Sequence, residues 1–555
     1  MAFPTDSAID SPIPKSADTR GEKSGLARTL GSISLGMLSL GVVGLGLHNL
    51  GNRYFWTDES SSFFTALGWP APGQQPGGLA EIQQTLITFL DPGLYHLMIR
   101  AWSELFGTSI QSLRSLPFLF FALYAVALVL WYRRFKFPLI VASAGVAVMM
   151  LENITPFYAV EVRAYSASLA AAVILPLVAL WLLDHPSGRR LTGFLAVGLF
   201  FGAMQYTAVS VNLATAALLL VGVVRARSST SRLIVGVAAL VIASVLPLIY
   251  LVTRGWPSGG AEADLDHVRT LVLAYMDTPT LVQTLGTNFL SFTALPRTVF
   301  LLLVPALLVI SVMRRSANAR PRIQRPAQEI LELWLYVLVL TVSAALTSVT
   351  GLLPWVLGTR WSITEVAGIA LSMLGLISLA RQYAPRSLLK TPVIRTLGVL
   401  GLTLVVAVGS WRLWTYERPG DSQALDELVP VLVSGNAETP IVVDYWIFPD
   451  TRYWVEYSGE FEQWRQAWIQ RGVASTDGFV KAGPGDVRAF LESSSDRMLL
   501  KDSEALDLLI EPLPADIQVV YPSEPDFGSP GLTSAPIVLV KSDSSPGSGV
   551  QGRSQ

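Results

Sequence analysis

The sequence predicts a mainly α-helical, polytopic membrane protein with interfacial helices in its first external loop and a small C-terminal α/β region outside the membrane. Hydrophobic residues make up 51% of the chain and charged residues only 15%, and the mean hydropathy is +0.47. These values lie outside the range of soluble globular domains. The apolar residues also fall into blocks of about 17–22, the length that crosses a hydrocarbon core of roughly 30 Å.

About eleven such blocks follow one another along the chain, each a candidate span. The third block is short, and the fifth and sixth have no charged break between them, so ten or twelve spans are also compatible with the pattern. The blocks are 30–48, 114–132, 138–152, 164–183, 191–206, 207–224, 233–252, 297–313, 330–350, 361–380 and 396–413.

Basic residues predict the orientation, because short cytoplasmic loops collect Lys and Arg. They are dense in the N-terminal segment and in alternate loops, for example at Arg133, Arg134, Arg189 and Arg190, and sparse in the loops between. We therefore expect an integral inner or plasma membrane protein with a cytoplasmic N-terminus. The 49–113 loop, the 253–296 loop and the C-terminal region would then lie outside.

The chain divides by composition into four regions. Residues 1–29 form a cytoplasmic segment that we expect to be disordered, and residues 30–413 form the membrane domain with its 49–113 loop. Residues 414–542 alternate strand-like runs, at 440–445, 497–500, 517–520 and 537–540, with helical patterns, which indicates an α/β domain. The Ser-, Gly- and Pro-rich residues 543–555 are typical of a disordered tail.

Two features of the composition exclude whole classes of function. The chain has no cysteine, which removes disulfides, thiolate catalysis and cysteine zinc sites. Its net charge is −1 and its basic residues follow the topology, so nothing indicates a nucleic-acid partner.

Near the start of the first external loop, residues 56–62 read W-T-D-E-S-S-S, which places two adjacent carboxylates, Asp58 and Glu59, at the outer lip of the bundle. One interpretation is a cap and first-turn charge on an interfacial helix, since carboxylates are favoured there. The hydrophobic residues Phe63, Phe64, Ala66 and Leu67 would then lie on the membrane surface. The other interpretation is a catalytic pair.

Further candidates lie later in the external loops. D-P-G-L-Y-H-L-M-I-R-A-W at 91–102 supplies Asp91, and His96 and Arg100 lie four apart on one helical face. P-F-Y-A-V-E-V-R-A-Y at 156–165 supplies Glu161, Arg163 and Tyr165; if this segment is helical, Glu161 and Tyr165 share a face and Arg163 lies on another. Charged residues this close to a bilayer are candidate site residues, although lipid headgroups can also hold an arginine. Arg360 marks the outer end of the tenth block.

These motifs, in this order, resemble the lipid-linked-sugar glycosyltransferases of the GT-C fold. The resembling motifs are W-T-D-E-S, D-P-G-L-Y-H-L with the L-F-G and L-R-S-L-P that follow it, and Y-A-V-E-V-R-A-Y, within about residues 30–250. The branch is similar to glycosyltransferase family 39, with the protein O-mannosyltransferases, the lipid A aminoarabinose transferase and the rhizobial lipopolysaccharide galacturonosyltransferases. The resemblance implies a GT-C helical bundle, Asp58 as catalytic base with Glu59 beside it, and Glu161, Arg163 and Tyr165 as an E-x-R-x-Y motif. The sequence departs from the family pattern at one point. The family usually has His-Pro-Pro just before the Leu-Tyr pair, whereas this chain has Asp91-Pro92-Gly93.

The chemistry of such a transfer agrees with these residue types. A base must take the proton of the acceptor hydroxyl, which suits Asp58, and the departing lipid phosphate needs no protonation but does need a cation. Arg163 is the first candidate for that cation, followed by Arg360 and Arg254, because a guanidinium binds phosphate with two parallel hydrogen bonds. Direct displacement inverts the anomeric configuration. A divalent metal bridging Asp58, Glu59 and Asp91 is also compatible with the sequence.

We therefore predict a glycosyltransferase of the cell envelope that moves a sugar from a polyprenyl-phosphate donor, of the undecaprenyl or dolichyl type, to an exported lipid, polysaccharide or protein. Two alternatives come from other classes. A secondary transporter or flippase for lipid-linked sugars would place ionisable residues near the bilayer midplane in two repeats, which this sequence does not show. A non-catalytic, sugar-lipid-binding assembly protein would tolerate the loss of Asp58.

The predicted topology can be tested with reporter fusions. An odd number of spans starting from a cytoplasmic N-terminus places Gly435 and Gly188 in opposite compartments. Periplasm- and cytoplasm-specific reporters fused at these two positions are expected to be active in opposite patterns. The same pattern at both positions would contradict an odd number of spans.

Overall fold

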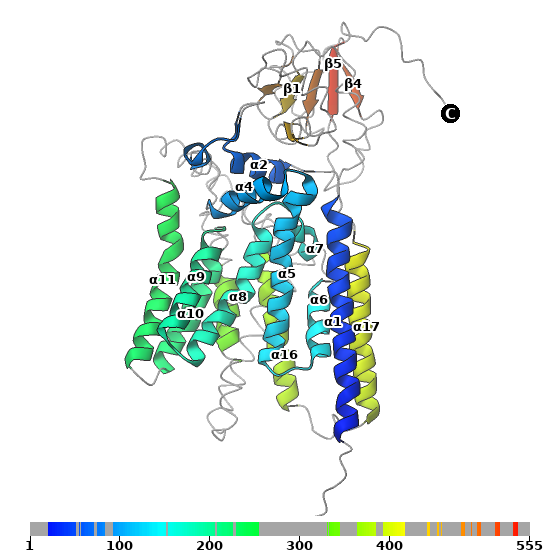
Figure 1. Ribbon diagram of the computed structural model, residues 1–555, viewed down its shortest axis with the longest axis vertical. Coiled ribbons are helices and arrows are strands. Elements are labelled where there is room, and N and C mark those ends of the chain that lie inside the picture. Colours follow the sequence, from blue (N-terminus) through cyan, green and yellow to red (C-terminus); the bar gives the residue numbers. More distant parts are fainter. Residues whose placement is uncertain are drawn as a thin grey trace, which may run out of the picture.

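The structure is a computed structural model, and its helices and strands are shown in Figure 1. The residues that it describes are 20–51, 55, 57–70, 75–83, 93–150, 154–205, 208–225, 229–254, 330, 332–343, 363–383, 392–416, 441–444, 452–453, 457, 479–482, 490, 497–500, 517–521 and 537–541. Among them, helices dominate up to residue 416 and strands follow.

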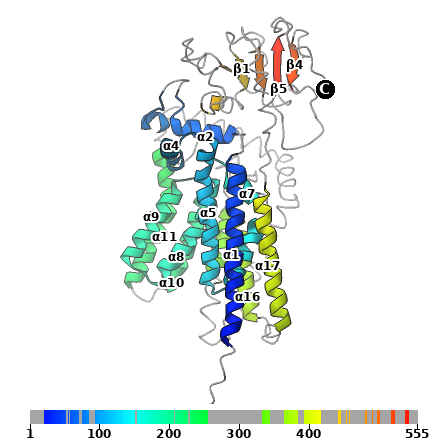
Figure 2. The same cartoon turned by 45° about the vertical axis from the view of Figure 1, so that its right-hand side comes forward.

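Long helices run side by side to form a bundle, and two helices of the first loop lie across one end of it (Figures 1 and 2). The bundle contains α1 (Arg20–Leu50), α5 (Ile110–Arg134), α6 (Leu139–Met150), α7 (Ile154–Ala159), α8 (Tyr165–Asp184), α9 (Gly188–Gly202), α10 (Ala208–Arg225), α11 (Ser229–Arg254), α16 (Ile363–Tyr383) and α17 (Pro392–Trp414). The two crossing helices are α2 (Thr57–Leu67) and α4 (Leu94–Phe106).

Four of the described helices are long and apolar enough to cross a membrane, namely Thr29–Asn49, Ile110–Arg134, Tyr165–Asp184 and Thr396–Trp414. Shorter apolar helices include Leu139–Met150, Ser210–Val223, Ser229–Ile242, Glu332–Ser343 and Val366–Ser378. Every predicted block overlaps a described helix except 297–313, which lies outside the described residues, as do residues 344–350 of the block 330–350. The helical blocks are thus confirmed, while the number of spans stays a prediction.

Two contacts explain how a proline and a glycine are accommodated inside the helices. Pro176 lies within α8 and has no N–H to bond the carbonyl of Ala172 one turn earlier; the Tyr336 hydroxyl donates to that carbonyl instead, at 2.7 Å. Helices α1 and α17 approach closely where Gly41 meets Ser410, since a Cβ on Gly41 would lie 2.8 Å from the Cα of Ser410. Such small residues are typical of packed membrane helices.

The C-terminal strands form one mixed sheet of order β2-β1-β3-β5-β4. Strand β1 (Ile441–Asp444) pairs in parallel with β2 (Phe479–Ala482) and β3 (Arg497–Leu500), while β5 (Ile537–Lys541) pairs antiparallel with β3 and with β4 (Ile517–Tyr521). The four predicted strands are confirmed, and the short β2 was not predicted. The helices expected between them lie outside the described residues, so the α/β domain and its boundaries stay predictions.

The sheet lies beyond the same end of the bundle as α2 and α4 (Figures 1 and 2). This end also buries the apolar residues of α2, because Phe63, Phe64 and Ala66 are 0% exposed and Leu67 is 4% exposed. Phe63 and Phe64 pack against the ring of Tyr457, at centroid distances of 5.0 and 5.8 Å. The prediction that this face of α2 lies on the membrane surface is therefore wrong, since a distant segment of the protein covers it.

Candidate functional site

The site is organised around a buried ion pair that joins α2 to the bundle. The Arg114 guanidinium donates through Nε to Glu59 Oε1 at 3.0 Å and through Nη2 to Oε2 at 2.7 Å. The two side chains are 1% and 0% exposed. Two parallel charge-assisted bonds in a buried setting define one geometry for both residues. Glu59 is therefore anchored toward α5.

Hydrogen bonds connect the same ion pair to three further segments of the chain. Arg114 Nη1 donates to the carbonyl of Asn49 at 3.3 Å, and the Asn49 amide donates to the carbonyl of Tyr416 at 2.8 Å. Glu59 Oε1 also accepts the backbone N–H of Val162 at 3.0 Å. The ends of α1 and α17 and the loop before α8 are thus fixed relative to α2.

Residues 160–164 form an irregular loop between α7 and α8, with a tight turn in which the Arg163 N–H donates to the Glu161 carbonyl at 2.6 Å. The expectation that Glu161 and Tyr165 share the face of one helix is therefore wrong. Tyr165 is instead the first residue of α8, whose N-cap, Ala164, offers no side-chain hydrogen bond. Arg163 is consequently held beside the positive end of a 20-residue helix.

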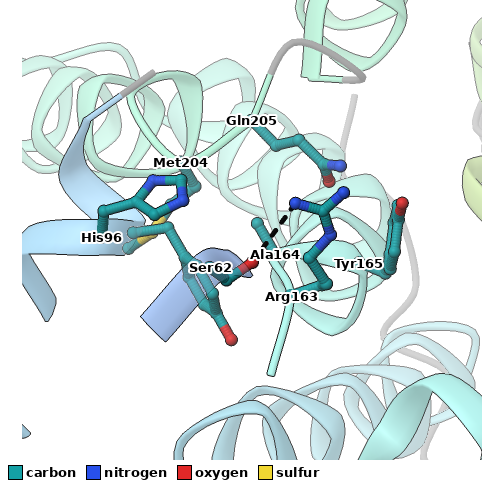
Figure 3. A pocket seen from close by; sticks show the side chains of 8 residues that line it. Ser62, His96, Arg163, Ala164, Tyr165, Met204 and Gln205 are labelled. Atoms are coloured by element: carbon teal, nitrogen blue, oxygen red, sulfur yellow. Dashed lines mark hydrogen bonds between the residues drawn. The ribbon is translucent and has the colours of Figure 1, made fainter. Parts of the chain in front are cut away.

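A small cavity of about 10 Å³ lies where this loop meets α2, α4 and the end of α9 (Figure 3). That volume is about enough for one water molecule. The residues that line it are Ser62, Tyr95, His96, Arg163, Ala164, Tyr165, Met204 and Gln205. A larger ligand would have to enter from the open side of the cavity and displace some of these side chains.

The Arg163 guanidinium is the cation at this cavity, and it is partly exposed there. Its Nη1 donates to Ser62 Oγ at 3.2 Å, and its Cζ lies 6.0 Å from the ring centroid of Tyr165. Figure 3 shows the Gln205 side chain over the same guanidinium, and Gln205 is itself oriented by a 2.6 Å bond from the Ser168 hydroxyl. The planar Arg163 guanidinium therefore faces the cavity, and part of its surface is exposed there.

Two residues of α4 form the opposite wall and carry no positive charge. Burial, with the nearby Arg163 cation, lowers the pKa of His96 to about 3, so this imidazole is neutral at physiological pH. Burial, followed by the carboxylates of Glu161 and Glu59, raises the pKa of Tyr95 well above its ordinary value. The Tyr95 hydroxyl therefore keeps its proton, and no described residue hydrogen-bonds to it.

The structure brings together some of the residues predicted from the sequence and not others. His96, Arg163 and Tyr165 line the cavity, and the buried Glu161 lies two residues before Arg163 in the same loop. Arg100 does not line it; this side chain pairs with Glu104 at 3.0 Å and donates to the carbonyl of Gly77. Asp91 and Arg360 lie outside the described residues.

Asp58 lies in the first turn of α2, four residues before Ser62. Residues four apart in a helix share a face, so the backbone places Asp58 on the face of α2 that carries Ser62 to the cavity. Glu59 lies about 100° further round, on the face that meets α5. The sequence predicted that Glu59 lies beside the catalytic base or binds a metal, whereas in the structure Glu59 pairs with Arg114.

A metal at Asp58, Glu59 and Asp91 was the cofactor considered from the sequence. Within the described ranges, no group of three His, Cys, Asp or Glu residues is arranged to hold an ion. Glu59 is the one member of the trio whose side chain is described, and both of its oxygens bond Arg114. A metal site that includes Glu59 would first have to break that pair.

Sequence reasoning gave no role to Arg114, Ser62, Tyr95 or Gln205. A signal existed for two of them: Arg114 is a charge at the first position of an apolar block, and Gln205 is a polar residue inside the long apolar stretch 191–224. Polar residues at such positions are costly unless they have partners, which marks them as candidates. The partners themselves come from distant segments and have no signature in the sequence.

Comparisons with known proteins find similarity in structure but not in sequence families. No family model matches this chain, and no curated protein is similar to it in sequence. Among solved structures, the chain is similar to ArnT from Cupriavidus metallidurans in the apo state, with a TM-score of 0.46, 16% identity, and coverage of 94% of this chain and 98% of that one. It is also similar to that ArnT bound to undecaprenyl phosphate, with a TM-score of 0.44, 13% identity, and coverage of 93% and 98%. Similarity at this level assigns no role to any residue of this chain.

Proposed function

We propose that this protein is a membrane glycosyltransferase that moves a sugar from a polyprenyl-phosphate donor to an exported acceptor, with inversion of the anomeric centre. The observation that carries the proposal is the position of Arg163. Its guanidinium faces a cavity at the end of the bundle, under the helix that carries Asp58 and beside the N-terminus of α8. An arginine and a helix N-terminus together favour a phosphate group.

In this proposal the phosphate of the donor binds Arg163, with the Tyr95 hydroxyl and the Gln205 amide as further donors of hydrogen bonds. The acceptor hydroxyl attacks C1 of the sugar while Asp58 takes its proton. The bond between C1 and the phosphate oxygen breaks, and its electron pair leaves with the lipid phosphate. Arg163 stabilises the negative charge that develops on that oxygen, which is the usual role of a fixed cation in such a step. The neutral His96 would orient the sugar or phosphate without adding charge.

Binding of undecaprenyl phosphate to the purified protein tests the donor half of this proposal. Arg163→Ala is expected to weaken binding about 10- to 100-fold, because hydrogen bonds from a charged group contribute about 1.5–3 kcal/mol. Arg163→Lys should recover part of the loss, since an ammonium keeps the charge but cannot make two parallel bonds.

The matched control is Arg190→Ala. Arg190 also lies over an aromatic ring, at 4.6 Å from the centroid of Trp181, but it belongs to the far end of α8 and α9. Its loss should change binding by less than about twofold, as expected for a surface residue. If Arg163→Ala and Arg190→Ala bound the lipid equally well, Arg163 would be a structural residue and Arg360 would become the first candidate.

A further inference from the structure

A short segment far along the chain covers α2 from the side opposite the bundle. Its described residues are Arg452, Tyr453 and Tyr457, and we call it the C-terminal clamp. Arg452 is 2% exposed and Tyr453 is 0% exposed, although more than 380 residues separate Arg452 from the segment that it contacts. Burial of an arginine at such a contact requires specific partners.

Arg452 has two partners on or next to α2. Its Cζ lies 4.4 Å from the ring centroid of Phe64, and its Nη2 donates to the carbonyl of Pro70. A cation over an aromatic ring is attracted to the negative face of the ring, more strongly when both are shielded from water. Arg452 therefore contacts α2 at the C-terminal end of that helix.

The turn at this end of α2 needs such support. Gly68 and Trp69 both have positive φ, at 72° and 47°, and Trp69 has a side chain that disfavours this conformation. The turn is closed by the Trp69 N–H donating to the Phe64 carbonyl at 2.9 Å. Arg452 bonds to the next residue, Pro70, and to the ring of Phe64, so it holds both sides of a strained turn.

Tyr453 fixes the clamp to the other elements of the site. Its ring lies 4.2 Å from that of Phe55 and 5.6 Å from that of Phe63, centroid to centroid. Its hydroxyl donates to the carbonyl of Thr108, in the turn between α4 and α5, at 2.8 Å. The clamp thus joins α2 to the helix that carries His96.

We propose that Arg452 and Tyr453 are positioning residues, which hold α2 so that its Asp58 and Ser62 face remains at the cavity beside Arg163. The Glu59–Arg114 pair fixes the first turn of α2 from one side, and the clamp fixes its last turn from the other. The importance of this position for catalysis rests on the proposed function, whereas the mechanical coupling itself does not.

Hydrogen–deuterium exchange of the full-length protein tests the coupling. Arg452→Ala is expected to speed the exchange of α2 amides, residues 57–67, about tenfold, with little change in α5 and α8. The matched control is Lys541→Ala, which removes a cation 4.8 Å from the ring of Phe490 within the C-terminal region and leaves α2 untouched. Equal exchange of α2 in Arg452→Ala and Lys541→Ala would overturn the proposal, as would a rise spread equally over α5 and α8.

Two further variants keep the test decisive if Arg452→Ala fails to fold. Arg452→Lys keeps a cation near Phe64 but loses the guanidinium geometry, so its α2 exchange should fall between wild type and the Ala variant. Tyr453→Phe keeps the ring contacts and loses the bond to Thr108, so faster exchange is expected at the 107–112 turn. Wild-type exchange in both variants would overturn the proposal.

The same variants separate this inference from the proposed function. Arg452→Ala should weaken binding of undecaprenyl phosphate no more than the loss of Ser62 would, that is severalfold, since Arg163 itself is kept, while transfer falls about tenfold or more. If exchange rises but Arg163→Ala leaves lipid binding unchanged, the clamp stands and the donor assignment fails. If Arg163→Ala weakens lipid binding but Arg452→Ala leaves the exchange of α2 unchanged, the donor assignment stands and the clamp fails.

Discussion

Replacement of Arg114 by Ala is expected to destabilise the protein by about 3–5 kcal/mol, the cost of leaving one partner of a buried ion pair without the other. The Glu59 carboxylate, 0% exposed, would keep the Val162 N–H but lose both bonds from the guanidinium. Asn49 would also lose a donor to its carbonyl. Equilibrium unfolding in mixed micelles, or the midpoint of thermal unfolding in detergent, measures the loss.

Arg134 provides a matched control for this prediction. It makes the same two-bond contact, with Asp184 at 2.9 and 3.2 Å, but the side chains are 20% and 30% exposed. Water and salt screen such a pair, so Arg134→Ala should cost about 0–1 kcal/mol. Equal destabilisation by the two variants would contradict the role of the Arg114 pair.

A double variant tests whether the Glu59–Arg114 pair stabilises the protein or instead holds α2 in position. Glu59→Met with Arg114→Met removes both charges, so much of the destabilisation of Arg114→Ala should disappear. We still expect this variant to lose transfer, because α2 and the 160–164 loop are no longer joined by the Glu59 bonds to Arg114 and Val162. The structure therefore predicts that Glu59 is sensitive to substitution for a structural reason.

Much of the fold was predictable because bilayer thickness fixes the length of an apolar helix. Blocks such as 114–132 and 164–183 coincide with α5 and α8, and runs of β-branched residues marked β1 and β5. The strand β2, F-V-K-A, is four residues long and carries a lysine, so it has no comparable signal. Contacts with distant segments decide whether such a segment becomes a strand.

The candidate site was predictable in its residues but not in its pairings. The motif Y-A-V-E-V-R-A-Y directed attention to Arg163, which lines the cavity. The partner of Glu59 is 55 residues away, and the partner of Arg452 is 382 residues away. No local periodicity encodes contacts of this range. For the same reason the apolar face of α2 was assigned to the membrane, although Tyr453 and Tyr457 cover it.

Asp58→Asn is expected to lower sugar transfer by roughly two to four orders of magnitude, the usual scale for the loss of a general base. Asparagine keeps the shape and the hydrogen-bonding ability of a first-turn residue, so α2 should still form. The negative charge that accepts the proton is absent. Because the Arg163 guanidinium that holds the phosphate is kept, binding of undecaprenyl phosphate should be unchanged, and the loss should appear in kcat rather than in donor affinity.

Ser62→Ala is the matched comparison for Asp58→Asn. Ser62 shares the helical face of Asp58 and bonds Arg163 through its hydroxyl at 3.2 Å. Its loss should weaken donor binding only severalfold, as expected for one hydrogen bond to a charged group, with kcat much less affected. A loss of transfer in Ser62→Ala as large as in Asp58→Asn would indicate that this face of α2 acts through position and not through a base.

The most direct measurement is comparative mass spectrometry of glycolipids, polysaccharides and glycoproteins from a strain that lacks this protein, complemented with wild type or with Asp58→Asn. We predict that one sugar modification disappears, that its polyprenyl-phosphate donor accumulates, and that wild type but not Asp58→Asn restores the modification. Sugar uptake into proteoliposomes should not depend on the protein. An unchanged set of glycans, or full restoration by Asp58→Asn, would contradict the proposed transfer reaction.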